Sequence, residues 1–314
     1  MRRRSMPLIA AIAAVTAFAA PAAQQGYQQP PQVIVDIMSA PPLPGVSLSP
    51  DRSTLLLSYR DSMPSIAEVA APWIGLAGLR ISPDTNGPHT LNAPRALALK
   101  DVATGAERKL ALPDDGFFSG TFSPDGRHVA ITHTTGDTIR LLVADVATGT
   151  VRTVLDRGVN GIAGGCDWLE SSDGFFCHLI PQGRGAAPER PRVPEGPTIQ
   201  ENAGRALPGR TYQDLLDDAH DARLFDYYYA SQLAHVGLDG RVTPIGAPGA
   251  YDAVERSHDE RYLLVPRLKK PYSYLVPVWQ FAREVELWDR AGTVSPEGMS
   301  ATLFWVEEIG RAHV

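Results

Sequence analysis

The chain has 314 residues, of which 44% are hydrophobic and 20% are charged, so it can bury a core and its composition excludes an intrinsically disordered protein. Acidic residues outnumber basic ones by 35 to 29, and the formal net charge of −6 argues against a nucleic acid partner. The 28 glycines and 27 prolines indicate many short strands joined by turns.

The first 23 residues have the features of a secretory signal peptide. Three arginines at positions 2–4 precede an Ala-rich apolar stretch from Leu8 to Ala20, and Ala20-Pro21-Ala22 fits a cleavage site. A membrane anchor is the alternative, but the stretch is short and weakly apolar. We therefore expect residues 1–23 to be removed, which leaves 26 basic and 35 acidic residues and no membrane span. The mature chain is then expected to be periplasmic or secreted.

A repeat dominates the main body, and its clearest copy spans residues 123–155. Ser123-Pro124-Asp125-Gly126 has the residues of a tight β-turn. Apolar residues then alternate on two strands, Arg127 to Thr132 and Ile139 to Val143. Asp145-Val146-Ala147-Thr148-Gly149 turns the chain into a further strand, Val151 to Leu155, because Gly149 can adopt a positive φ.

Other copies of these two turns recur along the chain. Asp101 and Asp145 open near-identical turns 44 residues apart, which is the size of a four-stranded propeller blade. Unrelated hairpins in a β-sandwich are the alternative. We predict an all-β propeller over residues 24–306, incomplete, with about four to five or more blades. The further copies are Ser49-Pro50-Asp51-Arg52, Ser171-Ser172-Asp173-Gly174, Ser257-His258-Asp259-Glu260, Asp101-Val102-Ala103-Thr104-Gly105 and Trp288-Asp289-Arg290-Ala291-Gly292.

The two cysteines, Cys166 and Cys177, flank a predicted hairpin whose turn is Ser172-Asp173-Gly174. The ends of such a hairpin can meet, and export would allow a disulfide to form. Two buried free thiols are the alternative.

An insertion is predicted at residues 181–225. Pro181 to Arg210 is rich in proline, glycine and arginine and reads as a long exposed loop. Thr211 to Phe225 follows as a short helix, with Thr211 as its N-cap and Asp214 completing a capping-box-like pair.

No motif in the chain predicts a catalytic, cofactor-binding or metal-binding residue. The G-x-S-x-G elbow, the Walker loop, the dinucleotide fingerprint and H-E-x-x-H are absent from the sequence. An acidic cluster could hold a hard or borderline cation, but it lacks calcium-loop spacing, which favours a solvated helix face. The cluster comprises Asp214, Asp217, Asp218, His220 and Asp221.

Several stretches are far more specific than the turns. They include Leu48-Ser49-Pro50-Asp51-Arg52, Leu76-Ala77-Gly78-Leu79-Arg80-Ile81, Gly196-Pro197-Thr198-Ile199-Gln200-Glu201, Arg210-Thr211-Tyr212-Gln213-Asp214-Leu215-Leu216 and Val285-Glu286-Leu287-Trp288-Asp289. With these residues the chain resembles glutamyl endopeptidase-like members of the prolyl oligopeptidase family, up to about Val294.

The resemblance implies a propeller that restricts the access of peptides to a C-terminal α/β-hydrolase domain. That domain carries the Ser, Asp and His of the family, and the resemblance ends before it. The chain is therefore expected to have no catalytic residue of its own, to need no cofactor, to be inactive alone and to meet a peptide substrate only through the absent domain.

Two further expectations concern the end of the chain and its function. The last residues, from Glu308 to Val314, resemble a translated sequencing adapter, so residues 307–314 are expected not to be native. The first functional hypothesis is the propeller of an exported serine peptidase. The alternative is a non-catalytic, TolB-like periplasmic propeller that binds proteins, which the turn motifs fit equally well but the specific stretches do not.

Overall fold

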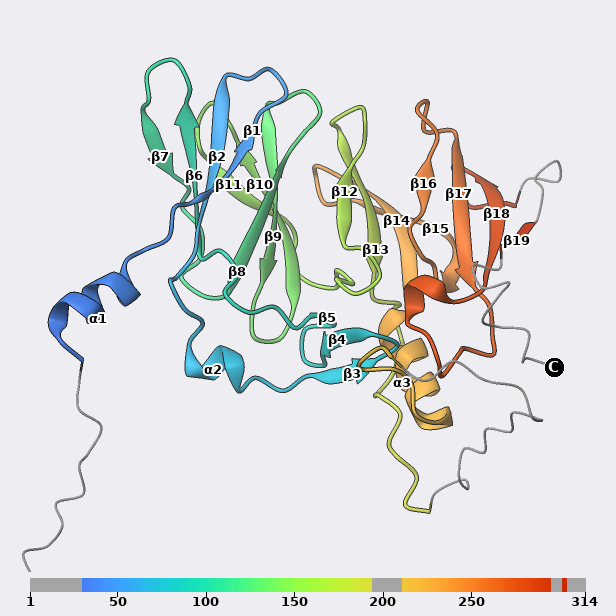
Figure 1. Ribbon diagram of the computed structural model, residues 1–314. Helices are drawn as coiled ribbons and strands as arrows, with labels where there is room; N and C mark the ends of the chain where they lie inside the picture. The colour runs from blue at the N-terminus through green and yellow to red at the C-terminus, as the bar shows by residue number, and fades with distance from the viewer. Residues whose placement is uncertain (1–29, 194–210, 295–300, 304–314) are drawn as a thin grey trace, which may run out of the picture. The chain divides into compact units, whose positions relative to one another are not determined.

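The computed structural model describes residues 30–193, 211–294 and 301–303 (Figure 1). The predicted leader and the predicted non-native tail lie outside these residues. The chain divides into two compact units, residues 1–40 and 41–314. In the described part of the first unit, helix α1 (Gln32–Ser39) has no buried residue. No helix in the described ranges is long and apolar enough to cross a bilayer.

The second unit contains four antiparallel sheets of four strands, which we call blades 1 to 4 in chain order. Figure 1 shows them side by side. Blade 1 is formed by β1 (Gly45–Leu48), β2 (Thr54–Tyr59), β6 (Ala96–Asp101) and β7 (Glu107–Lys109); blade 2 by β8 (Phe117–Phe122), β9 (His128–Thr134), β10 (Ile139–Asp145) and β11 (Val151–Leu155); blade 3 by β12 (Cys166–Trp168), β13 (Gly174–Leu179), β14 (Ser231–Gly237) and β15 (Val242–Gly249); and blade 4 by β16 (Glu255–Arg256), β17 (Tyr262–Leu268), β18 (Arg283–Asp289) and β19 (Ala301–Leu303).

Neighbouring blades pack face on face, and strand β10 shows how its sequence achieves this. Successive side chains of a strand point to opposite faces. Leu142 and Ala144 enter the core shared with blade 1. Leu141 and Val143 enter the core shared with blade 3. Because β10 is buried on both faces, its sequence is a continuous apolar run. Each blade packs its faces against its neighbours, so the repeated units are consecutive blades of a propeller, as predicted.

The turn between the first two strands of each blade is the first predicted motif. In three blades the opening serine accepts the backbone N–H of the residue five positions on, and its hydroxyl donates to the aspartate two positions on. These serines are Ser49, Ser123 and Ser257. In blade 3 the equivalent backbone bond joins Leu169 N to Gly174 O at 3.0 Å, so the turn begins two residues before the predicted copy at Ser171.

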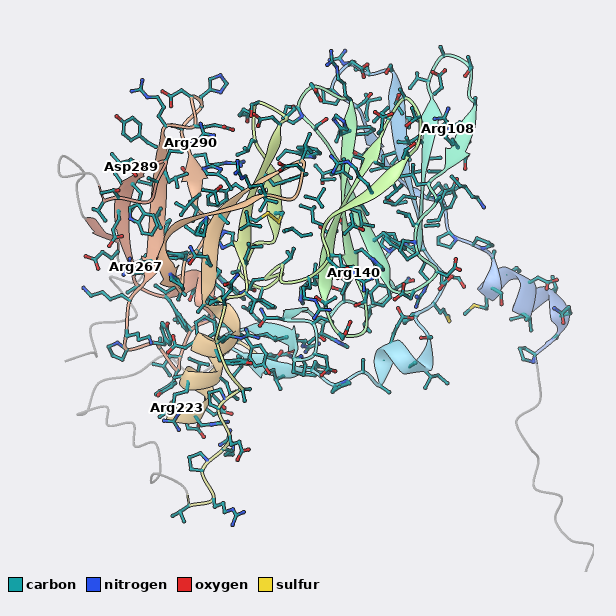
Figure 2. All side chains as sticks on the ribbon, turned by 180° about the vertical axis from the view of Figure 1, so that it is seen from behind. Arg108, Arg140, Arg223, Arg267, Asp289 and Arg290 are labelled. Atoms are coloured by element: carbon teal, nitrogen blue, oxygen red, sulfur yellow. A yellow bond between two sulfur atoms is a disulfide. The ribbon has the colours of Figure 1, made fainter. Side chains whose placement is uncertain are left out.

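The turn between the last two strands is the second motif, and it also links blades. In blades 1 and 2, Asp101 and Asp145 each accept the N–H and hydroxyl of the threonine three positions on. Arg108, which is labelled in Figure 2, then donates to the carbonyl of Ala147 in the blade 2 turn at 2.7 Å. Arg152 reaches the Leu238 carbonyl of blade 3 in the same way. In blades 1 and 2, an arginine of the last strand thus links the blade to a turn of the next blade.

Long insertions between the second and third strands of blades 1, 3 and 4 share one hydrophobic core. Blade 1 inserts α2 (Ile66–Val69) and the small sheet β3 (Ile74–Leu76), β4 (Leu79–Ser82) and β5 (Gly87–Pro88); blade 3 inserts α3 (Ala219–Tyr229); and blade 4 inserts a 3₁₀ turn (Val278–Gln280). Blade 2 has only a tight turn at this end, closed by the bond from Thr135 N to Thr138 O at 2.9 Å.

The helix predicted from Thr211 begins later, at Ala219, so its predicted start was wrong. Asp214 has a φ of +58°, which no helix can contain. The N-cap is Asp218, whose side chain accepts the N–H of Asp221 at 3.0 Å. Much of the predicted exposed loop, residues 194–210, lies outside the described part of the chain.

Candidate functional site

A cavity of about 810 Å³ lies where the insertion of blade 1 meets blades 2 and 3. Its walls come from three separate segments, and they include the edge strands β8 and β12. The residues that line it include Ser65, Glu68, Asp84, Thr85, Asn92 and Arg95 from the insertion, Phe117 to Ser119 from β8, and Cys166 from β12.

A capping box places Glu68 in the wall of this cavity. Ser65 is the N-cap of α2 and accepts the N–H of Glu68 at 3.2 Å, while Glu68 Oε2 accepts the N–H of Ser65 at 2.7 Å. This is the S-x-x-E pattern of a helix N-terminus. The Glu68 side chain is only 8% exposed.

Arg95 makes three polar contacts and one aromatic contact through its guanidinium group. Its Nε lies 3.0 Å from Asp61 Oδ2, and its Nη2 lies 3.2 Å from Glu68 Oε2. Its Nη1 donates to the carbonyl of Gly116 at 3.4 Å, and the group stacks 4.9 Å from the centroid of Phe117. These contacts use three of the five N–H donors of the guanidinium group, and the Arg95 side chain is 39% exposed.

Glu68 is ionised at neutral pH despite its burial. Burial acts to raise the pKa of Glu68, but hydrogen bonds from Ser65 and the charge of Arg95 outweigh it, so the net pKa is below its ordinary value. The cavity therefore has a charged acidic group in its wall.

Ser231 and His178 make the one side-chain hydrogen bond between a serine and a histidine in the described ranges. Ser231 Oγ lies 3.0 Å from His178 Nδ1. Ser231 is fully buried and His178 is 6% exposed, so neither can meet a peptide. The pair fills a core rather than forming a nucleophile and base at a surface.

The acidic residues that lie close together in the sequence form ion pairs within the insertions of blades 1 and 3. Arg190 bridges Asp218 and Asp221 at 2.6 and 2.9 Å, and Arg80 pairs with Asp214 at 2.9 Å. The described ranges hold no group of three residues that could ligate a metal ion.

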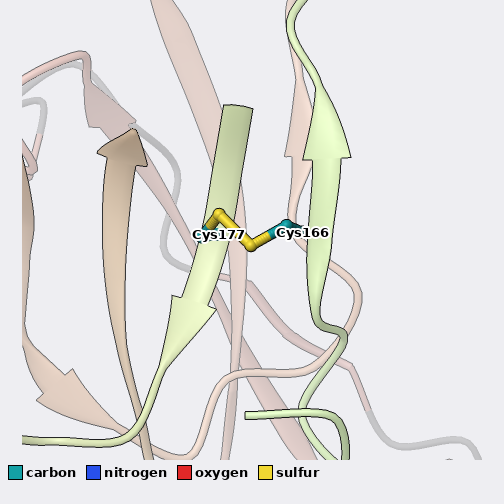
Figure 3. The surroundings of a disulfide bond; sticks show 2 residues. All are labelled: Cys166 and Cys177. Carbon is teal, nitrogen blue, oxygen red and sulfur yellow. A yellow bond between two sulfur atoms is a disulfide. The ribbon is translucent and has the colours of Figure 1, made fainter. Parts of the chain in front are cut away.

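Cys166 and Cys177 lie directly opposite each other on β12 and β13 and form a disulfide (Figure 3). Their Cα atoms are 4.1 Å apart. The bond closes the hairpin that carries the edge strand of blade 3 at the cavity wall.

Comparison with known proteins shows what the chain is similar to. No protein-family model matches it. In an alignment of 282 positions that covers 85% of this chain, it is 37% identical to proteins named "Probable glutamyl endopeptidase, chloroplastic" from Oryza sativa subsp. japonica and Arabidopsis thaliana. Over most of its length the chain is similar to glutamyl endopeptidase-like members of the prolyl oligopeptidase family, as the sequence motifs indicate, and its blades form a propeller portion.

This propeller spans 30% of the Oryza sativa relative and 29% of the Arabidopsis thaliana relative. Solved structures that resemble it include the β-propeller domain of the Pyrococcus furiosus trilobed protease, at 9% identity and a TM-score of 0.43, covering 84% of this chain and 59% of that one. Another is TolB from Acinetobacter baumannii, at 13% identity and a TM-score of 0.37, covering 86% of this chain and 56% of that one.

Proposed function

We propose that this chain is the substrate-access propeller of an exported serine peptidase that acts on peptides, with the chemistry performed by a hydrolase domain outside these 314 residues. The 37% identity to glutamyl endopeptidases over 85% of the chain carries the proposal. The described residues support it because their one side-chain hydrogen bond between a serine and a histidine is buried. The leader predicted at residues 1–23 supports export to the periplasm or the medium.

In this proposal the parent enzyme cleaves peptide bonds through an acyl-enzyme. A serine attacks the carbonyl, a histidine takes its proton, and an oxyanion hole holds the developing charge. The names of the relatives favour cleavage next to a glutamate. The propeller limits which peptides reach the serine and offers a binding surface beside it.

A fluorophosphonate probe, which labels nucleophilic serines, tests whether the catalytic serine lies outside this chain. The isolated chain should remain unlabelled at concentrations that label a serine peptidase completely. Labelling of any serine in the chain would contradict the proposal.

The genomic DNA beyond the codon for Val306 tests whether a hydrolase domain belongs to the same protein. We expect an open frame that continues into a hydrolase domain with a G-x-S-x-G elbow. A stop codon there would favour a binding propeller without catalytic function.

A further inference from the structure

Two asparagines meet in the interior of the second unit, where the insertion of blade 1 contacts the connection between blades 2 and 3. Asn86 and Asn160 are 2% and 0% exposed. Asn86 Nδ2 donates to Asn160 Oδ1 at 2.8 Å, and the backbone N–H of Gly161 donates to the carbonyl of Asn86 at 3.1 Å. We call Asn86 and Asn160 the asparagine latch, because their bonds join two segments that are far apart in the sequence.

The end of helix α3 completes the asparagine latch. Both side-chain nitrogens donate to the carbonyl of Tyr228, at 3.0 and 3.1 Å, and Asn160 Nδ2 also donates to the carbonyl of Ala230 at 3.0 Å. Asn160 Oδ1 accepts the backbone N–H groups of Ile162 and Ala163, each at 3.1 Å. The latch therefore needs an amide at position 160, because one end of the side chain must donate to carbonyls while the other end accepts.

Arg184 makes the two halves of the latch chemically different. Its Nη1 donates to Asn86 Oδ1 and to the carbonyl of Tyr227, and its guanidinium lies 3.9 Å from the centroid of the Tyr227 ring. The hydrogen-bond partners of the Asn160 side chain in the described ranges are uncharged. Asn160 also lies at the C-terminal end of α3, where the helix dipole disfavours a negative charge.

Each asparagine of the latch is followed by a glycine, and the other two asparagines of the chain are not. A Cβ on Gly87 or Gly161 would lie 2.6 Å from Ile139 Cδ1, so the packing requires glycine at both positions. An Asn-Gly pair is prone to deamidation because glycine has no Cβ to hinder the reaction. The glycine nitrogen attacks Cγ of the asparagine, ammonia leaves, and water opens the resulting succinimide to aspartate or isoaspartate.

We propose that Asn160 is a modification site at which deamidation opens the asparagine latch. In the closed latch the N–H of Gly161 and the Asn160 amide are both held by hydrogen bonds, so the reaction requires local opening. The aspartate that forms places a carboxylate oxygen against the helix carbonyls to which the amide nitrogen donated. A buried charge without a cationic partner is costly, so the modified latch stays open.

The same reaction at Asn86 has a smaller effect, because an aspartate at that position keeps Arg184 as its partner. Opening of the latch changes the wall of the cavity, since Thr85, Pro88 and Gly161 line it. The reactants are residues of this chain and water, so the inference stands apart from the proposed peptidase function.

Deamidation rates of the full chain test the protection. The chain is incubated at mildly alkaline pH with and without urea, and aspartate and isoaspartate at position 160 are measured by peptide mass spectrometry. The rate should be about tenfold or more lower in the folded chain. Asn86→Ala should raise the folded rate severalfold, whereas Asn92→Ala, outside the latch, should leave it unchanged. Equal rates in the folded and unfolded chains would overturn the proposal.

Two aspartate variants test the consequence of the modification. Asn160→Asp should lower the equilibrium constant for folding about tenfold more than Asn86→Asp, and Arg184→Gln should remove the advantage of Asn86→Asp. Hydrogen exchange in Asn160→Asp should accelerate in residues 79–92 and 158–166 and stay unchanged in residues 128–145. Equal losses of stability in the two single variants, or unchanged exchange in residues 79–92, would overturn the proposal. The rate comparison needs no variant, so it decides the matter if Asn160→Asp does not fold.

Discussion

The imidazole of His178 is buried in blade 3 beside Ser231. Burial lowers the pKa of His178 to about 4, with the charge of Asp252 acting in the opposite direction. The unfolded chain binds the proton near the ordinary histidine pKa of about 6.5. Stability from neutral His178 is therefore complete above that pH and is lost as the pH falls toward 4. The free energy of unfolding should be about 2 kcal/mol lower at pH 5 than at pH 8 from this residue alone.

Urea unfolding at pH 8 and pH 5 measures this loss. His178→Asn can keep a bond to Ser231 without titrating in this range, so it should lose less stability on acidification than the natural chain. His258→Asn, at an exposed position, should behave like the natural chain. An identical pH dependence in His178→Asn would show that this histidine is not the group responsible.

Two glycines with similar backbone angles should respond very differently to alanine. Gly116 and Gly105 have φ values of +79° and +72°, which cost an alanine about 1 kcal/mol or more at either position. A Cβ at Gly116 would lie 2.2 Å from the carbonyl oxygen of Thr134, whereas a Cβ at Gly105 meets nothing within 4 Å. We expect Gly116→Ala to lose about 3 kcal/mol and Gly105→Ala about 1 kcal/mol in chemical denaturation. Equal losses would show that β9 can move to admit the methyl group.

At the scale of the strand and turn, the sequence was most informative where side chains and backbone form a local bond. Ser123 and Asp145 fix their turns by contacts within five residues, so their motifs could be recognised without a structure. In blade 3, Leu169 replaces the serine, and the left-handed residue is Ser172 rather than a glycine. That blade therefore lacks the local signal, and the predicted register was two residues too late.

The hairpin of β12 and β13 gives a prediction for this scale. Its disulfide closes a loop between residues 166 and 177, and closing a loop of this length restricts the unfolded chain by about 3 kcal/mol. The double variant Cys166→Ala, Cys177→Ala should lose stability of that order in urea. Dithiothreitol should destabilise the natural chain and leave the double variant unchanged. An Ellman assay of the denatured, unreduced chain should find no free thiol, and two free thiols would contradict the bond.

At the scale of the whole second unit, the repeat predicts blades but not the site between them. The cavity is built from an insertion, an edge strand and a loop that lie up to about one hundred residues apart in sequence. Sequence reasoning picked out one candidate site residue in this cavity wall, Cys166, as half of a possible disulfide. The S-x-x-E pattern of Ser65 and Glu68 is present in the sequence, but it indicates a helix start rather than a cavity wall. The pairing of Arg95 with Asp61 and Glu68 depends on how the insertion folds back, which periodicity does not encode.

The outer faces of the two terminal blades give the last prediction. Val46 and Leu48 of blade 1 are 63% and 48% exposed, and Leu264 and Tyr262 of blade 4 are 41% and 39% exposed. Contiguous apolar positions on a sheet face favour association, because each inner blade face of this fold is buried against another. The 314-residue chain should therefore self-associate at micromolar concentrations, with a weight-average mass that rises with concentration in sedimentation equilibrium. Val46→Glu combined with Leu264→Glu should shift the chain toward the monomer. Ile66→Glu, at an 88% exposed position on α2, should not. If the double variant and Ile66→Glu have the same weight-average mass at each concentration, the blade faces do not mediate self-association.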